Sequence, residues 1–166
     1  GYETGKLVED QRVGENLKGA AENGIKTGVY FVTQATTPEE VDEEVEFLLK
    51  TIEPYEVKGP VAVGVEPTAE GNGRADGLSA KERTELVIRF CDKVKEAGYT
   101  PMIYYNFETA VLLTEVERLE DYAKWYASYS SDLYYPYYYS IWQYSANGHV
   151  DGISENVDLN MVFDTW

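Results

Sequence analysis

Buried strands and capped helices alternate along most of this 166-residue chain. The segment Lys26–Thr33 is rich in β-branched and aromatic residues, which is typical of a buried strand. Thr37, Pro38 and Glu40 then mark the start of a helix, as a hydroxyl cap, a first-turn proline and the carboxylate of a capping box. Apolar residues follow with helical spacing as far as Ile52. Strands that alternate with helices predict an α/β fold, with a mostly parallel sheet and helices outside it.

The alternation continues and then gives way to strands. Five more strands are expected, at Pro60–Glu66, Thr100–Asn106, Lys124–Tyr129, Tyr139–Tyr144 and Asn156–Asn160. Ser79 and Glu82 form a second capping box, which begins an amphipathic helix that Gly98 should end. Shorter helices are expected over Glu15–Asn23 and within Glu108–Leu119. The helices thus fade toward the C-terminus, where strands follow short loops.

Composition excludes several classes of function. The length suits one domain, so we expect a single domain over residues 1–166. The net charge of −16, from 14 basic and 30 acidic residues, argues against nucleic acid and anionic membranes as partners. No apolar run is long enough to cross a bilayer, and no signal peptide is visible in these residues. With one histidine, His149, and one cysteine, Cys91, we expect no metal, no cofactor and no internal disulfide.

Polar side chains fall at the carboxyl ends of the expected strands, where chemistry collects in parallel α/β folds. Glu66 and Asn106 each close a strand, and Gln143 and Asp158 lie in the last two. The chain also holds 15 tyrosines, whose rings stack on sugars and whose hydroxyls bond to them, although tyrosine suits a core equally well. Two carboxylates among aromatic residues indicate a glycosidase, in which one acid protonates the leaving oxygen. The plainer interpretation of Glu66 is a solvated charge or a cap partner.

Four motifs together resemble glycoside hydrolase family 25, the Chalaropsis-type N-acetylmuramidases or lysozymes. They are GVYF after a helix that ends in AENGI, then PVAVGVE, FCDKVKEAGYTPMIYYN and IWQYSANGHVDGISENVDLN. The resemblance runs from Gly1 to Phe163 and implies a TIM-like barrel of the (β/α)5(β)3 type. Here the barrel is expected to be incomplete, with about six strands, because Gly1-Tyr2 resembles the end of the family's second strand. The implied activity is cleavage of the β-1,4 bond between N-acetylmuramic acid and N-acetylglucosamine in peptidoglycan.

The resemblance also implies roles for single residues. Glu66 matches the family's proton donor and Asp158 its C-terminal acid, whereas Gly64 replaces the aspartate that stands two positions before the donor. The residues expected to line the sugar cleft are Tyr30, Tyr104, Asn106, Tyr126, Trp142 and Gln143. Since Gly64 and the missing first strand remove two acids, activity should be weakened or absent. The open alternatives are a non-catalytic saccharide-binding or structural remnant, and an engineered fragment.

The same resemblance sets the expected surroundings of the protein. Its partners would be the glycan chains of peptidoglycan, without nucleic acid or membrane. The protein would be secreted or associated with the cell wall, and it would come from a bacterium or a phage. A parallel barrel normally needs about eight strands to close, so about six would leave sheet edges exposed. Exposed edges favour strand pairing between copies, and a homodimer through such an edge is therefore a hypothesis.

Overall fold

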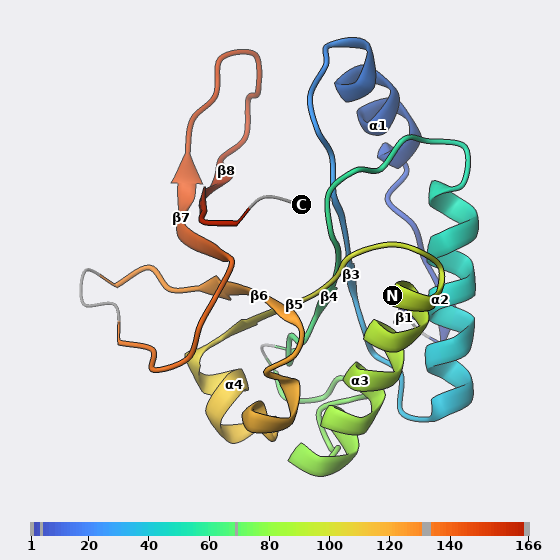
Figure 1. Cartoon of the computed structure of the whole chain (residues 1–166), viewed down its shortest axis with the longest axis vertical. Helices are drawn as coiled ribbons and strands as arrows, with labels where there is room; N and C mark the ends of the chain where they lie inside the picture. The colour runs from blue at the N-terminus through green and yellow to red at the C-terminus, as the bar shows by residue number, and fades with distance from the viewer. Residues whose placement is uncertain (1, 4, 69, 131–133, 165–166) are drawn as a thin grey trace.

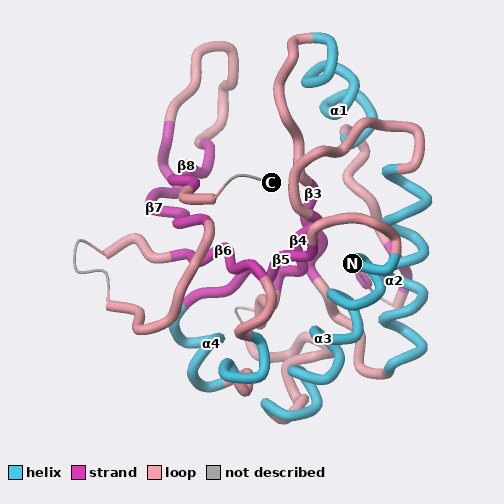
Figure 2. The backbone as a smooth tube through the Cα atoms, viewed as in Figure 1, coloured by secondary structure: helices cyan, strands magenta, loops and turns pink. Residues whose placement is uncertain are grey.

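The computed structural model describes residues 2–3, 5–68, 70–130 and 134–164 and forms a curled, open sheet with helices on its outer side (Figures 1 and 2). The sheet has six strands in the order β3-β4-β5-β6-β7-β8. Their bounds are β3 Val29–Val32, β4 Val61–Gly64, β5 Pro101–Asn106, β6 Ala123–Ala127, β7 Ile141–Gly148 and β8 Val157–Val162. Pairs from β3 to β7 are parallel, and β7 pairs with β8 antiparallel. The expected α/β fold, an incomplete barrel of six strands, is confirmed.

The helices are α1 Val13–Glu22, α2 Pro38–Ile52, α3 Ala80–Glu96, α4 Phe107–Leu112 and the 3₁₀ turn η1 Val116–Leu119. Three of them, α2, α3 and α4, begin at residues whose side chains cap them, whereas α1 and η1 have no side-chain cap. Ser79 and Glu82 form both halves of the capping box of α3. Thr37 caps α2, but the carboxylate of Glu40 accepts from the backbone N–H of Thr36 at 2.7 Å and not from the cap residue. The prediction that Glu40 completes the capping box is therefore wrong. The Glu40 carboxylate also pairs with Arg74, and it bonds to Thr36, one residue before the cap.

The main core lies between the outer face of the sheet and the helices. Alternate strand residues such as Phe31, Val63, Ile103 and Tyr105 point outward and are buried against α2 and α3. Cys91 on α3 belongs to this core, and burial raises the pKa of its thiol far above the usual range. The apolar helix stripes seen in the sequence are therefore the packing faces of the helices.

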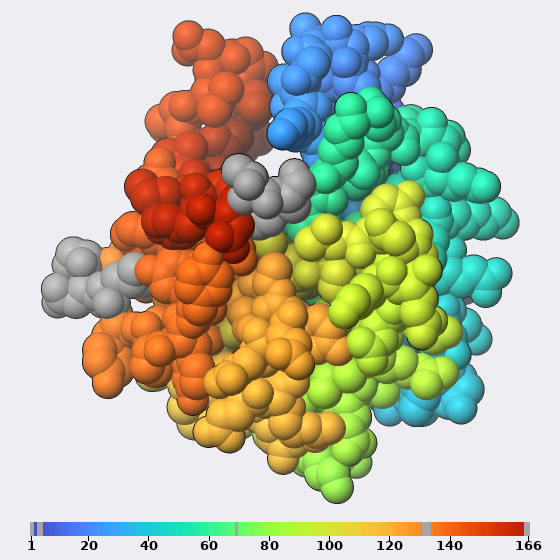
Figure 3. Space-filling view, in the orientation of Figure 1, coloured from blue at the N-terminus to red at the C-terminus, as the bar shows by residue number. Residues whose placement is uncertain are grey.

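The inner face of the sheet is only partly filled. Ala62, Met102 and Ile141 form a small second cluster there, while Tyr30 on β3 is 67% exposed. In the space-filling view the β7–β8 hairpin and the region of α1 stand apart with a gap between them (Figure 3). Among the described residues, β3 and β8 are the two edges of the sheet, so the barrel stays open.

The N-terminal segment does not join this sheet. Strand β1 (Tyr2–Glu3) pairs antiparallel with β2 (Lys6–Leu7) in a separate two-stranded ribbon. The expectation that Gly1-Tyr2 ends a strand of the barrel sheet is therefore wrong for Tyr2, and Gly1 lies outside the described residues. The physical reason is a tight turn at Gly5. Its φ of +79° is a backbone conformation that glycine adopts readily and other residues rarely adopt. The Tyr2 hydroxyl then donates to the carboxylate of Glu43 on α2.

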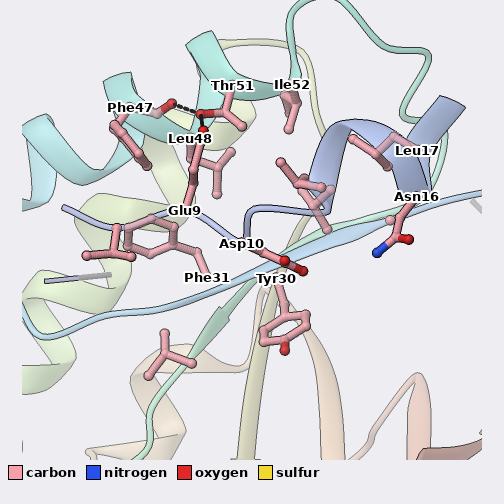
Figure 4. Close-up of a pocket in the computed structure, with 15 residues that line it drawn as sticks. Glu9, Asp10, Asn16, Leu17, Tyr30, Phe31, Phe47, Leu48, Thr51 and Ile52 are labelled. Carbon is pink, nitrogen blue, oxygen red and sulfur yellow. Dashed lines mark hydrogen bonds between the residues drawn. The ribbon is translucent and has the colours of Figure 1, made fainter. Parts of the chain in front are cut away.

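A mainly apolar pocket of about 340 Å³ lies beside the β3 edge (Figure 4). It is bounded by β3, by Phe47, Leu48 and Ile52 of α2, and by residues 8–17. Homodimer pairing through this edge stays a prediction, which a single monomeric mass at all concentrations would contradict. Across the described residues, no helix is both long and apolar enough to cross a bilayer.

Lys124 on β6 lies almost fully buried, with its Nζ donating to the carbonyl of Glu120 at 2.6 Å. Burial lowers the pKa of Lys124 to about 8, from 10.5 for an ordinary lysine. Below pH 8 the buried ammonium group is charged and lowers the free energy of unfolding. As the pH rises from 8 toward 10.5, the folded chain loses this proton before the unfolded chain does, so its stability increases.

Replacing Lys124 with methionine should raise the free energy of unfolding at pH 7 by about 1–2 kcal/mol, after allowance for solvent screening and the lost hydrogen bond. Urea denaturation at pH 7 and near pH 10.5 measures this, and the gain should shrink at the higher pH. The matched control is Lys58→Met, because the Lys58 side chain is 59% exposed. A loss of stability at pH 7 would contradict the prediction.

Candidate active site

A pocket of about 450 Å³ lies at the carboxyl ends of β4, β5 and β6, where parallel strands end at one rim. Its walls are the segments that follow these strands, namely residues 65–67, Tyr104 with 106–109, and residues 126–129. Strand order alone brings these three segments together, since they are distant in the sequence. The pocket is separate from the one beside the β3 edge, with which it shares no lining residue.

Glu66 stands in this pocket, two residues after Gly64 ends β4. Burial of the carboxyl group raises the pKa of Glu66, and the carboxylate of Asp158 raises it further. Asp158 comes from β8, on the same inner face as Asn160, which pairs with Gln143 of β7. The carboxylates of Glu66 and Asp158 therefore interact electrostatically, although Asp158 is not among the residues that line the pocket. A carboxyl group with a raised pKa keeps its proton at higher pH, as a proton donor must.

A buried glutamine connects two tyrosines beside these acids. Gln143 is 2% exposed, and its Oε1 accepts from the Tyr104 hydroxyl at 2.8 Å and from the Tyr129 hydroxyl at 2.7 Å. Burial is the main cause that raises the pKa of Tyr104, followed by Tyr129 and Glu66. The phenols therefore stay neutral, and their protons point toward Gln143.

Two other predicted cleft residues line the pocket while serving the fold. Asn106 caps α4, with its Oδ1 accepting from the backbone N–H of Thr109 at 2.9 Å. Tyr126 is 2% exposed and stacks on Tyr135, with ring centroids 4.2 Å apart. Both residues therefore have a structural role in addition to any contact with a ligand.

The structure does not bring Trp142 and Tyr30 into this pocket. Trp142 lies on the opposite face of β7 from Gln143, and its indole N–H donates to the carbonyl of Ser128 at 2.9 Å. Tyr30 lies on the inner face but lines the pocket beside the β3 edge (Figure 4). The two-residue period of a strand accounts for Trp142, because it turns neighbouring side chains to opposite faces. Tyr30 is outside the pocket because it lies on the edge strand β3, whereas the pocket lies at the ends of β4, β5 and β6.

Sequence reasoning missed two aromatic residues near the site. Tyr129 was placed inside an expected strand, whereas β6 ends at Ala127 and Tyr129 follows it at the rim. Trp125 lies on the inner face, with its ring centroid 5.0 Å from that of Tyr104 and its indole N–H donating to Asn160 at 2.8 Å. The strand-end position of Tyr129 and the alternation of β6 were the signals that could have found them. In the described part of the chain, no group of three or more His, Cys, Asp or Glu side chains could hold a metal ion.

An open α/β barrel with an acid pair at its strand ends is the architecture of a glycoside hydrolase. The sequence profile of Glycosyl hydrolases family 25 matches residues 3–153, and the chain belongs to this family. No curated protein sequence matches the chain.

Three solved structures illustrate the likeness in fold. The modular autolysin LytC from Streptococcus pneumoniae, in complex with a synthetic peptidoglycan ligand, has 23% identity and a TM-score of 0.82 over 92% of this chain and 37% of that one. The CTP1L endolysin has 19% identity and a TM-score of 0.79 over 95% of this chain and 54% of that one. The spore cortex lytic enzyme SleM from Clostridium perfringens has 20% identity and a TM-score of 0.77, over 95% and 55%. The chain therefore spans between 37% and 55% of the length of these proteins.

Proposed function

We propose that this chain is a muramidase-type glycosidase that cleaves the β-1,4 bond after N-acetylmuramic acid in peptidoglycan. The observation that carries this proposal is the place of Glu66 in the pocket at the carboxyl ends of the parallel strands, where burial and the charge of Asp158 raise its pKa. Family membership supports the reaction class. The substrate class is supported by LytC, whose structure holds a synthetic peptidoglycan ligand.

Each acid has one task in the proposed reaction. Glu66, whose pKa is raised by its surroundings, gives its proton to the glycosidic oxygen as the bond to the leaving sugar breaks. Asp158, whose charge acts on Glu66, is assigned the second task, which is to stabilise the positive charge that develops on the sugar ring or to activate water. Tyr104 and Tyr129, fixed by Gln143, and the capping residue Asn106 form the polar and aromatic wall that orients the saccharide.

Gly64 sets the expected strength of this activity. It stands where the family's motif has an aspartate, so one stabilising carboxylate is absent from the pocket. Loss of one such group lowers a rate by on the order of 10²–10³. We therefore expect slow hydrolysis, by a single domain over residues 1–166 that acts outside the cell or on the cell wall.

The second candidate is a saccharide-binding protein without catalysis, which the observed Gly64 favours. Both candidates are tested by incubating the chain with purified peptidoglycan, then measuring bound protein by pull-down and new reducing ends by borohydride reduction and mass spectrometry. Reduced muramic acid ends support the muramidase. Binding without new ends supports the second candidate, and neither binding nor new ends contradicts both.

A further inference from the structure

The segment that follows β3 is held by a buried carboxylate. Glu44 on α2 is 0% exposed, and its two oxygens accept from the Thr33 hydroxyl at 2.6 Å and from the backbone N–H of Gln34 at 3.1 Å. Burial raises the pKa of Glu44, and these two hydrogen bonds oppose that effect. A buried carboxylate is costly unless hydrogen bonds satisfy it, so this geometry is closely defined.

Gln34 extends from this anchored turn to the segment that carries Glu66. Its Nε2 donates to the backbone carbonyl of Glu66 at 3.4 Å, and its Oε1 accepts from the backbone N–H of Ala75 at 3.2 Å. Arg74, next to Ala75, donates to the backbone carbonyl of Gln34 at 3.4 Å. One side chain thus bridges both ends of the loop that begins at the pocket.

The other bonds of this loop close it on itself or join it to helices α2 and α3. Asp76 accepts from the backbone N–H groups of Thr68 and Gly73, which closes the loop on itself. Those bonds fix the shape of the loop but not its place relative to the sheet. Three contacts join the loop to the rest of the fold: the Gln34 side chain, the pair of Arg74 with Glu40 on α2, and the Arg83 guanidinium on α3, which donates to the carbonyl of Ala75 at 2.8 Å. Of these three, Gln34 is the one that also bonds to Glu66, and its own backbone is fixed by Glu44.

We propose that Gln34, held in place by Glu44, is a positioning residue that sets the location of Glu66 in the pocket. This inference rests on the proposed function only for its effect on rate. Neither Glu44 nor Gln34 lines a pocket described above, so both act through the backbone of Glu66 and Ala75. A small displacement of a reacting group lowers a rate strongly, so the connection should be visible in turnover.

The test compares Gln34→Ala, Glu44→Ala, their double variant, and Glu44→Gln. Each alanine variant should lower kcat on peptidoglycan roughly tenfold with KM little changed. The double variant should be no slower than the slower single variant, because both changes break one connection. Glu44→Gln should restore most of the rate, since its amide can still pair with both groups. The matched control is Thr84→Val, which removes a buried hydroxyl on α3 that accepts from the backbone N–H of Glu115 at 2.8 Å and lines neither pocket.

Two readouts that do not depend on activity test the inference. If the wild type did not hydrolyse peptidoglycan, that result would count against the proposed function and not against this inference. In Gln34→Ala, the Ala75 amide should exchange with solvent at least about fivefold faster. The pKa of Glu66, followed by carboxyl ¹³C NMR, should move toward that of an ordinary glutamate. An unchanged amide and an unchanged pKa in this variant, or an effect on kcat no larger than that of Thr84→Val, would overturn the inference. Gln34→Ala decides alone if Glu44→Ala does not fold, because Gln34 is only partly buried.

Discussion

Replacing Glu66 with glutamine should abolish the lysis of cell-wall suspensions, with a fall in turnover of about 10³-fold or more. The amide has nearly the same shape as the carboxyl group but cannot give up a proton to the glycosidic oxygen. Because burial and Asp158 raise the pKa of Glu66, the wild-type residue holds that proton at a pH where an ordinary glutamate has lost it. Clearing of turbidity and release of reducing ends measure the effect.

The matched control for this change is Glu56→Gln. Glu56 precedes β4, at the opposite end of the strand from the pocket, and its exposed carboxylate pairs with Lys58 at 3.0 Å. This variant should lyse at the wild-type rate. If Glu66→Gln were as active as Glu56→Gln, Glu66 would have no part in the reaction.

Introducing aspartate at Gly64 should raise turnover by about 10²-fold. A Cβ built at Gly64 lies 2.8 Å from Oε1 of Glu66, and the next contact is Cγ2 of Val32 at 3.4 Å. Only the mobile end of the Glu66 side chain must therefore shift to make room. The added carboxylate would lie beside Glu66 and raise its pKa further, so the alkaline limit of activity should also move to higher pH.

The neutral variant Gly64→Asn separates the effect of the added charge from the effect of the added side-chain volume. It introduces a side chain of the same size at the same contact with Glu66 but adds no negative charge. A gain that appears with aspartate and not with asparagine supports an electrostatic role. A fall in turnover with both variants would show that the Glu66 side chain needs the space that Gly64 leaves, and that the site works without a carboxylate at position 64.

Much of the fold could be predicted because the signals are local. The hydroxyl of Ser79 with Glu82 begins α3 as expected, and Gly98 ends it with a φ of +88°. All six expected sheet strands are present. Most are short runs rich in apolar and aromatic residues, whereas Asn156–Asn160 alternates polar and apolar residues. The ribbon of Tyr2–Glu3 with Lys6–Leu7 could not be foreseen, because it depends on one tight turn and on Glu43 of a later helix.

The sequence predicts which residues lie at the ends of the strands, but it does not predict which face of the sheet each side chain occupies. Glu66 and Asn106 follow directly from the rule that chemistry collects at the carboxyl ends of parallel strands. Trp142 lies next to Gln143 in sequence but on the other face. Only their contacts in the folded chain show which of the two faces inward, because Trp142 packs against the main core and Gln143 bonds to Tyr104. The bond from Tyr129 to Gln143 joins a loop to a strand, and no spacing in the sequence encodes it.

The pKa of the Glu66 carboxyl group, measured by ¹³C NMR in the wild type and in Asp158→Asn, tests most directly whether the two acids share one site. The account predicts a wild-type pKa clearly above the value of about 4.3 for an exposed glutamate, and a lower value once the charge at Asp158 is removed. Activity should fall as the pH rises through the pKa of Glu66, so its alkaline limit should move down in the variant as well. A pKa of Glu66 that is ordinary in the wild type, or the same in both proteins, would contradict the account.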